Sequence, residues 1–177
     1  MVWARRVASA LAAMAATFGA LSAGAALAHR ALVTAPVAGA MRVPGVLAYR
    51  LQTNGGAPSV AVQLADEVDL EAVCQRLTAR LTPILGSGVR LVPAGPGQAS
   101  LTTALEAVAV PVEQGIATGD FVAMARAVGA EARARGLSAR VEVDAGAVYV
   151  TLTGPGGRSA YALFPRSGGA RAAGVAP

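Results

Sequence analysis

The chain has 177 residues, and its 15 basic residues, all arginine, outnumber its 10 acidic residues to give a net charge of +5. A single cysteine excludes an intrachain disulfide, and together with a single histidine it supplies too few ligands for a zinc cluster. Aromatic residues are scarce, at one Trp, three Tyr and three Phe, and no short window is dense in arginine. Because a nucleic-acid surface needs a basic stripe with aromatic stacking platforms, this composition argues against nucleic-acid binding.

An uncharged apolar run covers residues 7–28 and follows the pair Arg5-Arg6. Its length matches the roughly 20 residues that cross a bilayer. Its positive start, apolar centre and small-residue end also match a secretory signal, and Ala26-Leu27-Ala28 fits the cleavage pattern. Residues 1–28 are therefore expected to be a cleaved signal peptide, with cleavage after Ala28, or an uncleaved signal-anchor transmembrane helix. Either alternative places the rest of the chain outside the cytoplasm, as a secreted or a membrane-anchored protein with its N-terminus inside.

The remaining chain divides by composition. Residues 29–44 are expected to be a spacer, because prolines and a glycine interrupt any periodic pattern. Residues 45–165 are expected to form one extracytoplasmic domain, or two lobes over 45–93 and 100–165 with a Pro- and Gly-rich loop between them. Residues 166–177 are rich in Gly, Ala and Ser without periodicity, which is typical of a disordered tail.

The first half of the domain predicts two strands, a helix and a short strand. Residues 46–52 and 59–64 flank a Gly-rich turn, which indicates a hairpin. Asp69 is expected to be the N-cap of a helix that ends near Leu81, because Pro83 lacks an N–H, with a distorted last turn through Ile84 and Leu85 as the alternative. The apolar stripe of this helix is Leu70, Val73, Cys74, Leu77 and Leu81. A short strand is expected at residues 89–92.

The second half predicts helices and then a meander. A short helix is expected over residues 101–108, followed by irregular chain because Pro111 would kink a helix. The alternation of Val108, Val110 and Val112 fits a strand equally well. A longer helix starts at Thr118 or Asp120 and ends before Gly136, a suitable residue to follow a helix C-terminus. Tight turns then connect three strands, which predicts an antiparallel meander. The strands are residues 138–144, 147–153 and 158–164.

The element order is β-β-α-β-(α)-α-β-β-β after the N-terminal signal or anchor helix. We therefore expect an α+β domain with one or more antiparallel sheets and with helices packed on one face. One continuous sheet and two α/β lobes both fit this order. None of these patterns resembles the signature of a known family.

Catalytic and metal-binding residue types form no clear constellation. The acidic run from Asp66 to Glu71 is typical of a helix start and lacks the EF-hand spacing, so neither a metal nor a cofactor is expected. The chain has no lysine, and its one histidine, His29, follows the apolar run, which argues against Ser-His and Ser-Lys mechanisms. Cys74 is expected to be a buried structural thiol. The carboxylates left for a hydrolase are Glu106, Glu113, Asp120 and Glu142.

The last predicted strand offers a candidate partner-binding edge. Arg158, Tyr161, Phe164 and Arg166 could bind a protein partner by strand addition if the aromatic side chains are exposed, and they belong to the core if they are not.

The favoured hypothesis is an exported or membrane-anchored bacterial envelope protein that acts as a non-catalytic binding or structural module. Its expected partners are the membrane, through residues 7–28 if they are uncleaved, and an envelope protein. The alternatives are a carboxylate-based extracytoplasmic hydrolase and an arginine-mediated binder of anionic lipid or wall polymer.

Overall fold

The computed structural model describes residues 34–52, 57–96 and 99–166. The expected signal or anchor helix over residues 1–28 lies outside these ranges, as does the expected tail beyond Arg166. Within the described ranges no helix is long and apolar enough to cross a membrane. The chain divides into two compact units, Met1–Ala40 and Met41–Pro177.

The first described element is a short helix, α2 (Ala35–Ala40), which belongs to the first unit. Part of the segment expected to be a spacer, residues 29–44, is therefore helical. Pro36 lies in the first turn of α2, where backbone N–H groups have no acceptor within the helix. The N–H that proline lacks is therefore not needed at this position.

The second unit contains two three-stranded sheets, and the first has the strand order β1 (Val46–Gln52), β2 (Ser59–Leu64) and β3 (Arg90–Ala94). β1 and β2 form the expected antiparallel hairpin. β2 and β3 are parallel, so the expectation of an antiparallel arrangement is wrong for this pair. The reason is the helix α3 (Leu70–Leu85) between them, which allows the chain to cross back over the sheet as a β-α-β unit.

Helix α3 begins as expected and includes the additional turn through Ile84 and Leu85 that was the alternative to an end near Leu81. Asp69 caps it by accepting the Ala72 N–H at 2.9 Å. The predicted stripe is buried, and it comprises Leu70, Val73, Cys74, Leu77 and Leu81. The helix continues past Pro83 to Leu85, because Pro83 is exposed in the last turn and the carbonyl group that loses its partner there can bind water.

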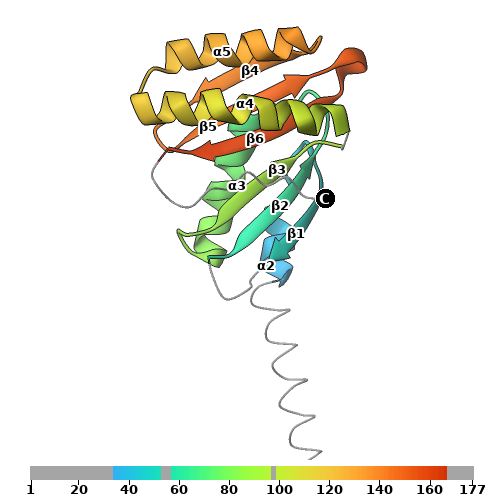
Figure 1. The fold of residues 1–177 in the computed structure, drawn as a ribbon. Coiled ribbons are helices and arrows are strands. Elements are labelled where there is room, and N and C mark those ends of the chain that lie inside the picture. Colours follow the sequence, from blue (N-terminus) through green and yellow to red (C-terminus); the bar gives the residue numbers. More distant parts are fainter. Residues whose placement is uncertain (1–33, 53–56, 97–98, 167–177) are drawn as a thin grey trace, which may run out of the picture. The chain divides into compact units, whose positions relative to one another are not determined.

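The second sheet is the expected antiparallel meander of β4 (Ser138–Val143), β5 (Ala147–Thr153) and β6 (Ser159–Pro165). A short 3-10 turn, η2 (Pro155–Gly157), connects β5 to β6. Figure 1 shows α4 (Ala99–Thr118) and α5 (Phe121–Ala134) side by side over this sheet. Their shared core includes Val108, Val112, Met124, Val128, Val148, Val150, Leu152 and Phe164.

Helix α4 runs without interruption through Pro111, so the expected end of the helix near Val108 is wrong. A proline inside a helix costs about 3 kcal/mol. Val108 and Val112 lie on either side of it, and each is 0% exposed against α5 and the sheet. Burial of a valine side chain contributes about 1.5–3 kcal/mol, so the two together offset the cost of Pro111.

Helix α3 borders the opposite face of the second sheet from α4 and α5. Val148 and Val150 of β5 pack into the core beneath α4 and α5, so Tyr149 between them points the other way. There the Tyr149 hydroxyl donates to Asp144, which also accepts from Gln75 of α3. The expectation of helices on one face therefore holds for α4 and α5 but not for α3.

Candidate functional site

The two sheets meet where β3 ends and β6 begins. Gly95 follows β3, and a Cβ atom added to it would lie 2.1 Å from the Ser159 carbonyl oxygen. No residue with a side chain fits that distance, so the close approach of the two strands depends on glycine. The start of β3 and the end of β6 instead border a common groove. β3 and β6 therefore run in opposite directions and diverge from their junction at Gly95 and Ser159.

Hydrogen bonds hold this junction to the turn between β2 and α3. The Asp66 carboxylate accepts the Ser159 N–H at 2.7 Å. The Tyr161 hydroxyl donates to the Ala65 carbonyl oxygen at 2.6 Å and accepts the Val68 N–H at 3.1 Å. These contacts tie the first sheet to the second across a large separation in sequence.

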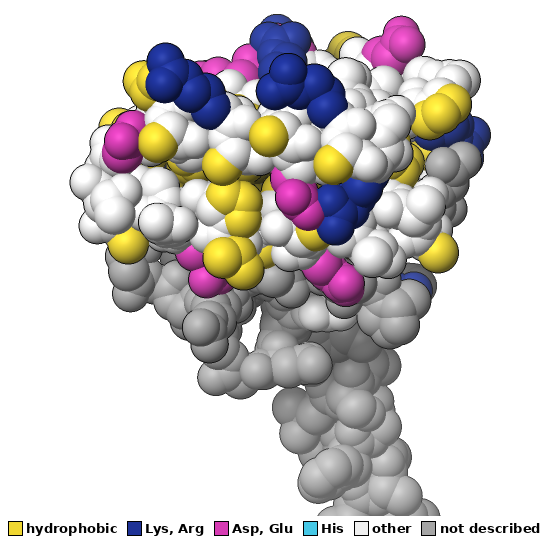
Figure 2. Space-filling view, turned by 45° about the horizontal axis from the view of Figure 1, so that its top comes forward, with side chains coloured by type: hydrophobic (Ala, Val, Ile, Leu, Met, Phe, Trp, Pro, Cys, Tyr) yellow, Lys and Arg dark blue, Asp and Glu magenta, His cyan; other side chains and the backbone are white. Residues whose placement is uncertain are grey.

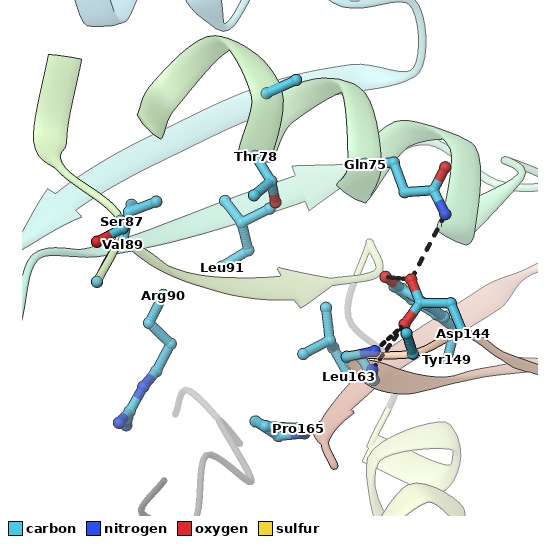
Figure 3. A pocket seen from close by; sticks show the side chains of 15 residues that line it. Gln75, Thr78, Ser87, Val89, Arg90, Leu91, Asp144, Tyr149, Leu163 and Pro165 are labelled. Atoms are coloured by element: carbon cyan, nitrogen blue, oxygen red, sulfur yellow. Dashed lines mark hydrogen bonds between the residues drawn. The ribbon is translucent and has the colours of Figure 1, made fainter. Parts of the chain in front are cut away.

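The groove between the diverging strands has a volume of about 870 Å³ and is open to solvent (Figure 3). One side of it is helix α3, which contributes Gln75, Thr78 and Ala79. The two walls are residues 87–91 at the start of β3 and, opposite them, the 144–147 turn with neighbouring side chains of β5 and β6. Most of these side chains are small or apolar. A groove of this size and character fits a ligand or a short chain segment.

The wall formed by β3 is an unpaired strand edge. The Arg90 N–H donates to the Pro58 carbonyl oxygen at 2.8 Å, so the backbone groups of Arg90 point toward β2. Backbone groups alternate in direction along a strand, so the N–H and C=O of Leu91 point toward the groove. Pro93 is two residues further on and has the same direction, but it has no N–H to donate.

The wall formed by β6 is also unpaired. The Arg166 N–H donates to the Gly146 carbonyl oxygen at 2.8 Å on the β5 side. By the same alternation, the backbone groups of Leu163 and Pro165 point away from β5 and toward the groove. In residues 57–96 and 99–166 no backbone hydrogen bond joins β3 to β6. The groove therefore lies between two strand edges whose Leu91 and Leu163 backbone groups lack a backbone partner there.

Asp144 orders the turn at one end of the groove. One carboxylate oxygen accepts the N–H groups of Gly146 and Ala147, both at 2.7 Å. The other accepts the Tyr149 hydroxyl at 2.8 Å and the Gln75 amide at 3.5 Å. Burial favours a higher pKa for Asp144, but these hydrogen bonds outweigh it and lower the pKa. Asp144 is therefore ionised at neutral pH and is suited to ordering the turn rather than to donating a proton.

The hydrolase candidates from the sequence do not lie in the groove. Glu106 and Glu113 are exposed on α4. Asp120 caps α5 by accepting the Ala123 N–H at 2.9 Å, and Glu142 pairs with Arg140 at 2.6 Å. Asp144 is the one carboxylate among the residues that line the groove. Over the part of the chain that the structure describes, no group of three or more His, Cys, Asp or Glu side chains could hold a metal ion.

The four candidate edge residues occupy separate environments. Tyr161 is 2% exposed at the junction, and Phe164 is 8% exposed in the core beneath α4 and α5. The Arg158 Nε atom is 3.8 Å from an Asp66 carboxylate oxygen. Arg166 lies 4.5 Å from the centre of the Phe121 ring and donates to the Asp144 carbonyl oxygen. Tyr161 and Phe164 are therefore core residues, which was the second of the two alternatives that the sequence left open.

Arg90 is the one cation among the residues that line the groove. In Figure 3 its side chain extends from the start of β3 on the side away from α3. Among the described residues no carboxylate forms an ion pair with it. Sequence reasoning did not select Arg90, because its partner strand and its groove arise from contacts that are distant in sequence.

Comparisons with known proteins give no match: no family model, no curated protein and no solved structure is similar to this chain.

Proposed function

We propose that this chain is a non-catalytic binding module of the bacterial envelope, and that its ligand site is the groove between β3 and β6. Residues 7–28 would export the module or anchor it in the membrane. The observation that carries the proposal is a groove of about 870 Å³ between two strand edges with unpaired backbone groups. Unpaired strand edges are the surfaces to which proteins add an extended segment of a partner.

The arrangement of polar groups favours binding over catalysis. An acid–base or nucleophilic mechanism needs a reactive group, a partner within hydrogen-bond reach and a place for substrate. The groove contains one carboxylate, Asp144, and both of its oxygens already accept hydrogen bonds. The thiol of Cys74 is buried outside the groove lining, and burial, followed by the charge of Asp144, raises its pKa to about 12.

The positions of the arginines favour a protein partner over an anionic polymer. Figure 2 shows arginine and acidic side chains interspersed on the surface over α4 and α5. Two of the nearby arginines are paired with acids, Arg135 with Glu131 and Arg140 with Glu142. Membrane or polymer binding by charge needs a surface dominated by one sign. A selective groove is the better-supported site.

Photocrosslinking in the native cells tests this proposal. A photoreactive residue at Thr78, which is exposed and lines the groove, should form a covalent adduct with the partner. The same residue at Ala134, which is exposed on α5, serves as the control position. Adding Ala79→Trp, which fills the groove from α3, should remove the Thr78 adduct, and Ala130→Trp on the exposed side of α5 should not.

Equal adducts at both positions, or a Thr78 adduct that persists with Ala79→Trp, would show that the groove is not the binding site. The export part of the proposal has its own test, which is the N-terminal sequence and cell fraction of the mature chain. A chain that begins at His29, or an intact chain in the membrane fraction, agrees with export, whereas an intact chain in the cytosol would contradict it.

A further inference from the structure

We propose that the groove binds an extended segment of a partner protein as an additional β-strand between β3 and β6, and that an acidic side chain of this segment pairs with Arg90. This inference deepens the proposed function and rests on it. It specifies the conformation of the ligand, the backbone groups that hold it and the charge that it carries.

The backbone geometry supports insertion rather than simple occupation of a pocket. Leu91 on β3 and Leu163 on β6 each direct an N–H and a C=O into the same groove. A strand between them can pair with both, because successive residues of a strand direct their backbone groups to opposite sides. The inserted strand would be parallel to one wall and antiparallel to the other, since β3 and β6 run in opposite directions.

The boundaries of the groove limit the length of the ligand. The closed end is the contact between Gly95 and Ser159, where a Cβ atom does not fit. Of the five residues of β3, only Arg90 and Leu91 line the groove, so backbone pairing between β3 and a ligand is confined to the start of this strand. Pro165 near the open end provides a carbonyl acceptor but no donor, so the backbone donors to the ligand are concentrated at Leu91 and Leu163.

Side-chain surroundings differ on the two faces of an inserted strand. One face would lie against α3, where Thr78 and Ala79 leave room for small or apolar side chains. Neighbouring residues on β3 point to opposite faces, so Arg90 lies on the other face from Leu91. No described carboxylate pairs with Arg90, whereas the oxygens of Asp144 are occupied by four hydrogen bonds. Charge complementarity therefore favours Glu or Asp on that face of the ligand.

Nuclear magnetic resonance on the full chain with synthetic probes tests this inference. The first probe is the blocked peptide acetyl-Val-Glu-Val-Glu-Val-amide, and its matched controls carry Lys or Gln in place of Glu. The Glu probe should shift the amide signals of Leu91 and Leu163 and should bind more tightly than either control. N-methylation of either of two neighbouring central amides should weaken binding about fivefold, because each removes one backbone hydrogen bond on a different side.

A charge reversal tests the assigned cation. Arg90→Glu should weaken binding of the Glu probe about tenfold, and the variant should bind the Lys probe more tightly than the Glu probe. Arg76→Glu makes the same charge change at an exposed position on α3 outside the groove lining and should leave the preference unchanged.

The outcomes separate this inference from the proposed function. If probes shift groove signals without a charge preference, or if N-methylation matters only at alternate positions, the groove binds ligands but strand insertion with a carboxylate is wrong. If Leu91 and Leu163 signals change on dilution, the occupant is a second copy of the chain. If they change when residues 167–177 are removed, the occupant is the chain's own tail. Either result would overturn the inference, and no shift with any probe would count against both proposals.

Discussion

Two glycines inside helices should respond differently to the same substitution, because only one of them is packed against a neighbouring helix. Gly115 lies in α4 and Gly129 lies in α5. A Cβ atom on Gly115 would be 2.5 Å from the Cβ of Met124, whereas ordinary contacts begin near 3.4 Å. At Gly129 the nearest atom is the flexible end of Arg133 at 3.9 Å. Gly115→Ala therefore forces α4 and α5 apart by about 1 Å, and Gly129→Ala does not.

The magnitude follows from two terms. Replacement of glycine by alanine inside a helix stabilises the fold by about 1 kcal/mol in either helix. Overpacking costs about 1–3 kcal/mol and applies to Gly115 alone. Gly129→Ala should thus raise the free energy of unfolding by about 1 kcal/mol. Gly115→Ala should leave it unchanged or lower it by up to about 2 kcal/mol, so the two variants should differ by about 1–3 kcal/mol.

Equilibrium urea unfolding followed by far-ultraviolet circular dichroism measures this difference. The dependence of the unfolding free energy on urea should be the same in both variants, because neither changes the surface exposed on unfolding. Equal stabilisation by Gly115→Ala and Gly129→Ala would refute the reasoning, since it would mean that α4 and α5 do not pack closely at Met124.

Three further predictions follow from buried polar groups. Tyr161→Phe should lower the free energy of unfolding by about 1–3 kcal/mol, because it leaves the partly buried Ala65 carbonyl and Val68 N–H without their shared partner. Tyr49→Phe at an exposed position should change it by less than about 0.5 kcal/mol. Cys74 should resist a thiol reagent at pH 8 in the folded chain and react after unfolding, because burial raises its pKa to about 12. Burial, and then the bond to Asp144, raises the pKa of Tyr149, so its contribution to stability should persist up to about pH 10 and decline above it. Tyr149→Phe should remove that alkaline decline in urea titrations, and an unchanged pH profile would contradict this assignment.

Local patterns were sufficient to predict the elements whose causes are local. The stripe of α3 and its Asp69 cap, and the turns of the β4–β6 meander, are specified by residues a few positions apart. The continuation of α4 through Pro111 was not predictable in this way, because the compensation comes from packing of Val108 and Val112 on a distant sheet. Gly115 has a tertiary cause of the same kind, since the atoms that exclude a side chain there belong to Met124 of α5.

The groove was missed for the same physical reason. Alternation in the last strand placed Tyr161 and Phe164 on opposite faces, but it could not indicate that both faces are covered. A signal was nevertheless present in β3 and β6. Pro93 and Pro165 each remove a backbone N–H from a predicted or adjoining strand segment. Proline cannot donate to a neighbouring strand, so its presence is typical of a strand at the edge of a sheet. Two prolines on strands from different halves of the chain would have been a reason to look for unpaired edges.

The hydrogen bonds at the junction also bear on how the chain acquires its fold. The bonds that join the β2–α3 turn to β6 connect residues 92 to 96 positions apart. Such contacts form only after a long loop has closed, so they slow folding and couple early and late segments in one transition. A chain that lacks β6 cannot complete the β2–α3 turn. The module would therefore reach its stable state only after its last strand has been synthesised, and if the chain is exported, it would cross the membrane before that state can form.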